Sequence, residues 1–168
     1  FGTSGAEATA INKTLEQTYG AACVKAYQLF TPDEEIEGVN NLYYVNHHPN
    51  EIITIDPVLY DAFAKLQDEP WLYLGPVYSH YYNLILNTAE ALVSELDGQA
   101  AAYVGKLAEF AGDRNAVKLE LLDNNQVKLC VSQAYLEFAA AEEIESFLDF
   151  GPLTNACIID YLAQTLID

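Results

Sequence analysis

The residues best suited to chemistry lie between Leu148 and Asp160, in the stretch LDFGPLTNACIID. An apolar segment, which we predict to be a strand, ends in Asp149 and turns at Gly151. A helix then begins with Thr154 and Asn155 in its first turn. The first turn of a helix has unpaired backbone N–H groups and the positive end of the helix dipole, which suit an anion such as phosphate. The spacing therefore predicts a ligand site at this junction.

Histidines offer a second kind of chemistry. His47 and His48 are adjacent in a polar turn signal that continues into Pro49. A metal site would need further ligands converging from elsewhere in the fold, so we interpret the pair as an exposed turn and assign no metal ligand. His80 lies among tyrosines, where we expect a packed or hydrogen-bonded side chain. No serine has a nucleophile-elbow pattern and no Gly-rich phosphate loop is present, so we assign no catalytic residue.

Aromatic residues are densest between Pro70 and Leu86, a stretch that includes the only tryptophan. Its tyrosines could stack on a planar ligand, but aromatic residues at helical spacing more often belong to a core or an interface. Both interpretations stay open for this cluster, which comprises Tyr73, Tyr78, Tyr81 and Tyr82.

The elements that must position these residues alternate between helices and short strands. The clearest signal is a β-hairpin over residues 118–131, with alternating apolar positions around the turn DNNQ. We expect an α+β fold in one domain spanning residues 1–168, with several helices packed on a small sheet that includes this hairpin. The other expected elements are helices over 6–30, 57–66, 132–141 and 154–167, one or two helices over 89–111, a short apolar segment over 42–46 and a brief strand over 52–55.

Composition excludes several classes of function. The chain has 168 residues, 51% of them apolar, and 25 acidic residues against 7 basic ones, which gives a formal charge of -18. Such a charge repels nucleic acid and anionic membranes. No apolar run approaches the roughly 18 residues that would span a bilayer. The acidic surface is interpreted as solvated, with a docking face for a basic partner as the alternative.

The three cysteines have neither disulfide nor zinc-site spacing. Cys23, Cys130 and Cys157 are odd in number and form no CxxC or His-paired motif. All three lie in apolar helix or strand patterns, so we expect small buried thiols.

The stretch from Leu148 to Asp160 resembles the strand-turn-helix of the ApbE family, the FAD:protein FMN transferases, whose usual form reads LDLGGIAKGYAVD. The family's residues are kept at four positions and changed at three that bear on phosphate binding. Those kept are Leu148, Asp149, Gly151 and Asp160; the second glycine, the lysine and the glycine after it are replaced by Pro152, Asn155 and Ala156.

Three weaker blocks follow the family's order. The helix ending in Gln28, Leu29 and Phe30 is similar to the helix that runs into "fS.y". The segment NNLYYVNHHPNEIITID resembles "SEIYRLN" and the short strand after it, with Asn46 at the matching asparagine. The run from Leu74 to Val77 resembles the "vGPL" that closes "GAFDPTIGPL", which puts Trp71 where the family has its aspartate.

The resemblance implies a flavin site, with FAD and magnesium as cofactors. By the family's motifs, the cofactor-binding residues would be Asp149, Gly151, Thr154, Asn155, Asp160 and Gly75. The family's chemistry uses magnesium and cationic groups to stabilise charge on the pyrophosphate, and the motif lysine is replaced by Asn155 here. Pro152 also removes a backbone donor where a phosphate loop needs one.

The family's metal-binding aspartate and threonine belong to a C-terminal half, so we expect this domain to be incomplete relative to the family. Phe1 is not a methionine, and we expect that it is not the native start. Our leading interpretation is a non-catalytic binding or interaction module, associated with a protein partner or a flavin or redox system. The alternative is part of a divergent magnesium-dependent FAD:protein FMN transferase. The resemblance implies an extracytoplasmic location at a bacterial cell envelope.

The segment SGAEAT, residues 4–9, resembles the flavin-acceptor motif SGATxT that these transferases modify, with Thr9 at the modified position. Short motifs match by chance at a high rate. Because Ser4 also suits the N-cap of the expected first helix, we favour capping and keep flavin attachment at Thr9 as the alternative.

Overall fold

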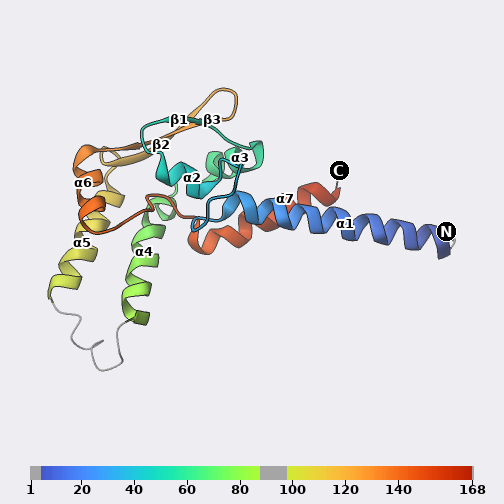
Figure 1. Cartoon of the computed structure of the whole chain (residues 1–168), viewed down its shortest axis with the longest axis horizontal. Coiled ribbons are helices and arrows are strands. Elements are labelled where there is room, and N and C mark those ends of the chain that lie inside the picture. The colour runs from blue at the N-terminus through green and yellow to red at the C-terminus, as the bar shows by residue number, and fades with distance from the viewer. Residues whose placement is uncertain (1–4, 88–97, 168) are drawn as a thin grey trace.

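The expected α+β class is confirmed by the computed structural model, which describes residues 5–87 and 98–167 (Figure 1). Within these residues the chain forms seven α-helices and one three-stranded antiparallel sheet. The helices are α1 (Gly5–Phe30), α2 (Leu42–His47), α3 (Pro57–Leu66), α4 (Pro70–Asn87), α5 (Gly98–Gly112), α6 (Gln133–Ala141) and α7 (Thr154–Ile167). The strands are β1 (Ile52–Thr54), β2 (Val117–Leu122) and β3 (Gln126–Val131).

The predicted hairpin is confirmed as β2 and β3, with β1 on the other side of β3. Its turn contains Asn124 and Asn125, both with positive φ (58° and 56°), which is the backbone of the tight turns that match the twist of paired strands. Asparagine tolerates this left-handed conformation better than most residues. The alternating apolar residues of β3, Val127, Leu129 and Val131, are buried on the inner face of the sheet.

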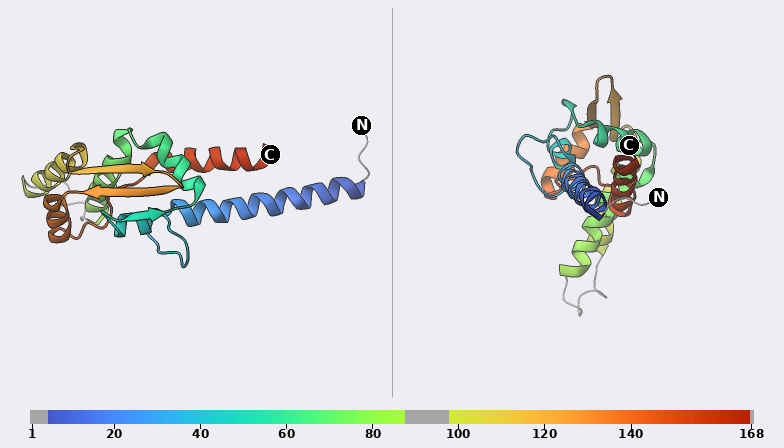
Figure 2. Two further views of the ribbon diagram at one scale, coloured as in Figure 1. Left: turned by 90° about the horizontal axis from the view of Figure 1, so that it is seen from above. Right: turned by 90° about the vertical axis from the view of Figure 1, so that its right-hand side faces the viewer.

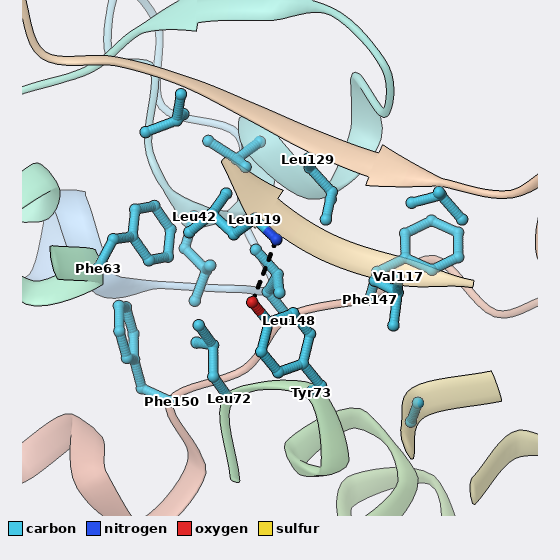
Figure 3. Packing of buried hydrophobic residues seen from close by; sticks show 14 of the residues in the cluster. Leu42, Phe63, Leu72, Tyr73, Val117, Leu119, Leu129, Phe147, Leu148 and Phe150 are labelled. Atoms are coloured by element: carbon cyan, nitrogen blue, oxygen red, sulfur yellow. Dashed lines mark hydrogen bonds between the residues drawn. The ribbon is translucent and has the colours of Figure 1, made fainter. Parts of the chain in front are cut away.

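The core lies beneath this inner face, where α2, α3 and α4 meet the segment that precedes α7 (Figure 3). Phe150 lies between Phe30 and Phe63, with ring centroids 5.4 Å from each. Tyr73 also belongs to the core: its hydroxyl accepts from the Leu119 amide at 3.1 Å and donates to the Gln67 carbonyl at 2.8 Å. The bond from Leu119 gives a partner to a backbone N–H at the outer edge of the sheet, because β2 is an edge strand.

Helices α1 and α7 lie side by side in opposite directions and project away from the sheet, forming a unit that we call the arm (Figures 1 and 2). The α1 face next to the body is buried at Ala22, Ala26 and Leu29. The same helical face continues toward the N-terminus as Ile11 and Leu15, which are about half exposed. Of nine exposed large hydrophobic residues in the described part of the chain, seven are on the arm: Ile11, Leu15, Tyr19, Val24, Tyr27, Ile159 and Leu166.

Two sequence expectations about local structure were wrong, namely a strand before Asp149 and buried cysteines, and the apolar segment over 42–46, which had no predicted element type, is helical. The segment before Asp149 is irregular and has no strand partner. Residues 42–47 form a helix, α2, begun by the Asn41 side chain, which accepts from the Tyr44 amide. The three cysteines are half-buried. Cys130, for example, alternates with the buried Leu129 and Val131 of β3 and so lies on the opposite face of the sheet.

The remaining helix and strand predictions hold where the structure describes them. Asp56 caps α3 with Pro57 at its start, and Ser132 caps α6 by accepting from the Tyr135 amide. The Ser4 cap and residues 89–97 of the expected 89–111 helices lie outside the described residues. No described helix is both long and apolar enough to cross a membrane.

Candidate functional site

Asn46 joins α2 to the segment before α7. Its side chain is buried, with 1% of the residue exposed, and it forms four hydrogen bonds across about one hundred residues of sequence, one of them from its amide nitrogen to the Ser146 hydroxyl at 3.3 Å. The amide oxygen accepts from the backbone N–H groups of Phe147 (3.0 Å) and Leu148 (2.9 Å), and the amide nitrogen donates to the Leu148 carbonyl (2.9 Å). These bonds replace the strand pairing that the segment lacks, because buried backbone groups must be paired.

Gly75 and Pro76 let Asp149 approach the backbone of α4. A proline has no N–H and cannot bond to the carbonyl four residues earlier, so Pro76 leaves the Leu72 carbonyl without its helical partner. The Asp149 amide fills that place and donates to the Leu72 carbonyl at 3.0 Å. A Cβ on Gly75 would lie only 2.5 Å from the Asp149 carbonyl oxygen, so the contact requires glycine.

The Asp149 carboxylate is bonded within the protein through both oxygens. Oδ1 accepts from the backbone N–H of Gly151 at 2.8 Å, and Oδ2 accepts from the Ser79 hydroxyl at 2.9 Å. The first bond helps to hold Gly151 at φ +49°, a conformation that favours glycine. We call the set of Asn46, Gly75, Pro76, Asp149 and Gly151 the clasp.

The start of α7 has fewer free N–H groups than the sequence suggested, because Thr154 already has a backbone partner. A 3-10 helix, η2 (Gly151–Leu153), precedes α7 and supplies carbonyl partners. Leu153 donates its backbone N–H to the Phe150 carbonyl (2.9 Å), and Thr154 donates to the Gly151 carbonyl. The first turn of α7 therefore continues an existing turn. Its Thr154 side chain is half-buried and Asn155 is exposed.

The predicted cofactor-binding residues separate into two places. Gly75, Asp149 and Gly151 meet in the clasp, with Thr154 and Asn155 just beyond it along the chain. Asp160 lies farther along α7 and forms an ion pair with Lys65 of α3. Their assignment to a cofactor stays a prediction from the resemblance.

Asp160 lies at a cavity of about 280 Å³ between α3 and α7, which we call the α3–α7 pocket. The Asp160 pKa is lowered by the hydrogen bond from Lys65, and the Lys65 pKa is raised by the same bond. Both groups are therefore charged near neutral pH. The pocket is lined by Phe30, Val58, Asp61, Ala62, Lys65, Leu66, Leu153, Ala156, Cys157, Asp160, Tyr161 and Gln164.

The histidine pair is not an exposed turn. Both histidines are half-buried, and each bonds through Nδ1 to a carbonyl four residues earlier in the chain: His47 to Tyr43 and His48 to Tyr44. Each ring also stacks on the side chain of that tyrosine, with centroids 3.8 Å apart. Across residues 5–87 and 98–167, no group of three His, Cys, Asp or Glu side chains could hold a metal ion.

The aromatic residues between Pro70 and Leu86 differ in their surroundings. Tyr73 is core, and the Arg114 guanidinium lies 3.6 Å from its ring centroid, so this tyrosine is no ligand platform. Trp71 is 53% exposed and fills no cleft. The side chains of Tyr78, His80, Tyr81 and Tyr82 lie outside the described part of the structure.

Thr9, the flavin-acceptor candidate, is exposed on α1, and its hydroxyl donates to the Gly5 carbonyl at 2.8 Å. The threonine is thus reachable by another protein, although its hydroxyl proton is already used within the helix. Flavin attachment at Thr9 stays a prediction.

Sequence reasoning missed Ser79, Asp61 and Lys65. Ser79 follows Gly75 by four residues, one helical turn, and this spacing could have placed it on the face that meets Asp149. Asp61 and Lys65 have the same spacing on α3, which is the usual signal for neighbouring charges on a helix. No pattern in the sequence predicts the ion pair between Lys65 and Asp160.

Comparisons with protein-family models, curated proteins and solved structures found no significant match. The likeness to the ApbE family therefore rests on the motifs quoted above.

Proposed function

We propose that this chain is a non-catalytic binding module in which the ApbE-like motif holds the fold together. The observation that carries the proposal is the Asp149 carboxylate, whose two oxygens accept from Gly151 and Ser79. A flavin pyrophosphate with magnesium needs free oxygen ligands and donors directed at the phosphates. The residues of the clasp do not fit that requirement, because the polar side chains of Asn46 and Asp149 already bond to other groups of the protein.

The arm supports a role in binding another protein. It carries most of the exposed large hydrophobic residues of the described chain, and such residues gathered on one unit are typical of an interaction site. The described N-terminal half of α1 carries only Glu7, Lys13 and Glu16 as charged residues, in a chain of formal charge -18. A partner of either charge is therefore repelled or attracted less by this part of the arm than a chain of this net charge would suggest.

The proposal is tested by incubating the purified chain with FAD, magnesium and a peptide that contains an SGATxT acceptor. We expect no FMN on the peptide by intact mass, whereas an active FAD:protein FMN transferase should label the same peptide under the same conditions. Transfer by this chain that disappears on Asp149→Asn would overturn the proposal.

A second candidate is one part of a divergent magnesium-dependent FAD:protein FMN transferase. It is favoured by the meeting of three separate ApbE-like blocks, since Asn46, Gly75 and Asp149 all converge on one segment. The discriminating observation is whether the gene encodes, after Asp168, a segment with the family's metal-binding aspartate and threonine. If it does, the longer protein should be assayed with the same peptide, and transfer would establish this second function.

A further inference from the structure

The α3–α7 pocket joins an apolar interior to a charged rim. Its interior is formed by side chains such as Val58, Leu66 and Leu153, at the base of the arm. At about 280 Å³ it is just below the roughly 300–1,000 Å³ typical of ligand sites, so only a small molecule would fit.

The charges at the rim are unevenly paired. Lys65 forms an ion pair with Asp160. Asp61, one turn before Lys65 on α3, has no ion-pair partner within 4 Å among the described residues. The described lining of the pocket therefore has two carboxylates against one ammonium group, on a chain whose overall charge attracts cations.

The α3–α7 pocket is also lined by two aromatic side chains. Phe30 and Tyr161 line the pocket from α1 and α7. The face of an aromatic ring attracts a cation, and carboxylates combined with aromatic walls are a common way to recognise an organic ammonium group. A carboxylate ligand would instead meet Asp61 and Asp160, with a lysine whose charge is already balanced.

We propose that the α3–α7 pocket binds a small organic ammonium ion with an apolar substituent. The substituent occupies the apolar interior and the ammonium group lies at the rim beside Asp61. This inference deepens the proposed binding function by naming a ligand class, and its failure would leave the FMN-transfer result unchanged.

The test compares three probes of similar shape on the whole chain: phenethylammonium, phenylpropionate and neutral phenylethanol. Binding is followed by chemical-shift changes of the backbone amides. We expect saturable shifts at residues lining the pocket with phenethylammonium. We also expect the neutral alcohol to bind about two- to fivefold more weakly, which is the range for an exposed charge pair.

Two substitutions should change the affinity for phenethylammonium in opposite directions. Asp61→Asn should weaken phenethylammonium binding about two- to fivefold, because it removes the free carboxylate. Lys65→Met should strengthen the binding, because it removes the competing cation and frees Asp160. The matched control is Asp123→Asn in the hairpin turn, which makes the same charge change away from the pocket and should leave the affinity unchanged.

Two results would overturn the proposal. One is tighter binding of phenylpropionate that is lost on Lys65→Met, which would assign the pocket to anions. The other is no saturable shift with phenethylammonium up to about 10 mM, a concentration at which even a millimolar site would be filled. Both Asp61 and Lys65 are exposed, so loss of folding is not expected to obscure either variant.

Discussion

The clasp and the α3–α7 pocket are connected by one short stretch of chain, yet they use polar groups in opposite ways. In the clasp, the side chains of Asn46 and Asp149 bond to backbone groups or to a neighbouring hydroxyl inside the protein. In the pocket, Asp61, Lys65 and Asp160 are exposed to solvent. Polar groups that hold the fold together are unavailable to a ligand, whereas charges at a cavity rim remain able to meet one.

Substitutions in the clasp and at the pocket should also differ in their effect on the free energy of unfolding. A buried polar group that loses its partner costs roughly 1–3 kcal/mol, while an exposed ion pair contributes little. Substitutions in the clasp should therefore change the free energy of unfolding, and substitutions at the pocket should change binding.

The largest effect is expected for Asn46→Ala. It leaves the buried N–H groups of Phe147 and Leu148 without the partner that Asn46 provides, whereas the Leu148 carbonyl keeps the Ser146 hydroxyl as a donor. We expect a loss of about 3–5 kcal/mol in the free energy of unfolding, measured by urea denaturation. The control is Asn40→Ala, which removes one half-exposed bond to the Thr54 carbonyl and should cost no more than about 1 kcal/mol. Equal losses for the two variants would show that Asn46 has no special role.

Gly75→Ala should come next. Its new methyl group would lie 2.5 Å from the Asp149 carbonyl oxygen, so α4 and the segment before α7 must separate. Overpacking of this kind costs about 1–3 kcal/mol, and we expect the upper part of that range in the same urea measurement. The matched control is Gly105→Ala on α5, where a Cβ meets nothing within 4 Å and the exchange should stabilise the helix by about 0.5–1 kcal/mol. A Gly75→Ala protein as stable as the parent would contradict the close contact.

A smaller effect is expected for Asp149→Asn. The asparagine oxygen can still accept from Gly151 and its NH2 group can donate to the Ser79 hydroxyl, so the variant loses mainly the strengthening that the carboxylate charge gives these bonds, about 1 kcal/mol. Combining it with Ser79→Ala in a double-mutant cycle should give a coupling energy near 1 kcal/mol. Strictly additive losses would mean that the Ser79 bond does not form in solution.

The smallest effect on stability is expected for Asp160→Asn, since both members of the ion pair are about half exposed. The Asp160 pKa is lowered below its usual 3.8 and the Lys65 pKa is raised above its usual 10.5. The contribution of the ion pair to the free energy of unfolding is therefore fully present between the two usual pKa values, 3.8 and 10.5. It is lost as the pH falls through the lowered pKa of Asp160, or rises through the raised pKa of Lys65.

We expect only a small difference between the urea midpoints of parent and variant at pH 7, which disappears at both extremes of pH. A large difference at pH 7 would place the ion pair among the groups that hold the fold together and would remove the contrast with the clasp.

The sequence was a good guide where structure depends on neighbouring residues. The alternation of β2 and β3, the asparagines of their turn and the capping side chains Asp56 and Ser132 act over a few residues, and all were predicted. The sequence also placed Gly75, Asp149 and Gly151 in one proposed site, and the structure brings them together.

Prediction failed where the partners are distant in sequence. The run of apolar residues before Asp149 resembles a buried strand, but its burial comes from packing on all sides and its backbone bonds go to Asn46 and to Leu72. The Leu72 carbonyl is free only because of Pro76, which is a consequence of helix geometry that no pattern near Asp149 reveals. The pairing of Lys65 with Asp160 is equally non-local.

The most direct test of the central claim, that Asp149 serves the fold and binds no cofactor, is urea unfolding with and without FAD and magnesium. A ligand that binds only the folded state stabilises it in proportion to the logarithm of its concentration over its dissociation constant. We predict the same free energy of unfolding with and without FAD and magnesium. Stabilisation by more than about 1 kcal/mol in the parent protein, absent in Asp149→Asn, would contradict the account.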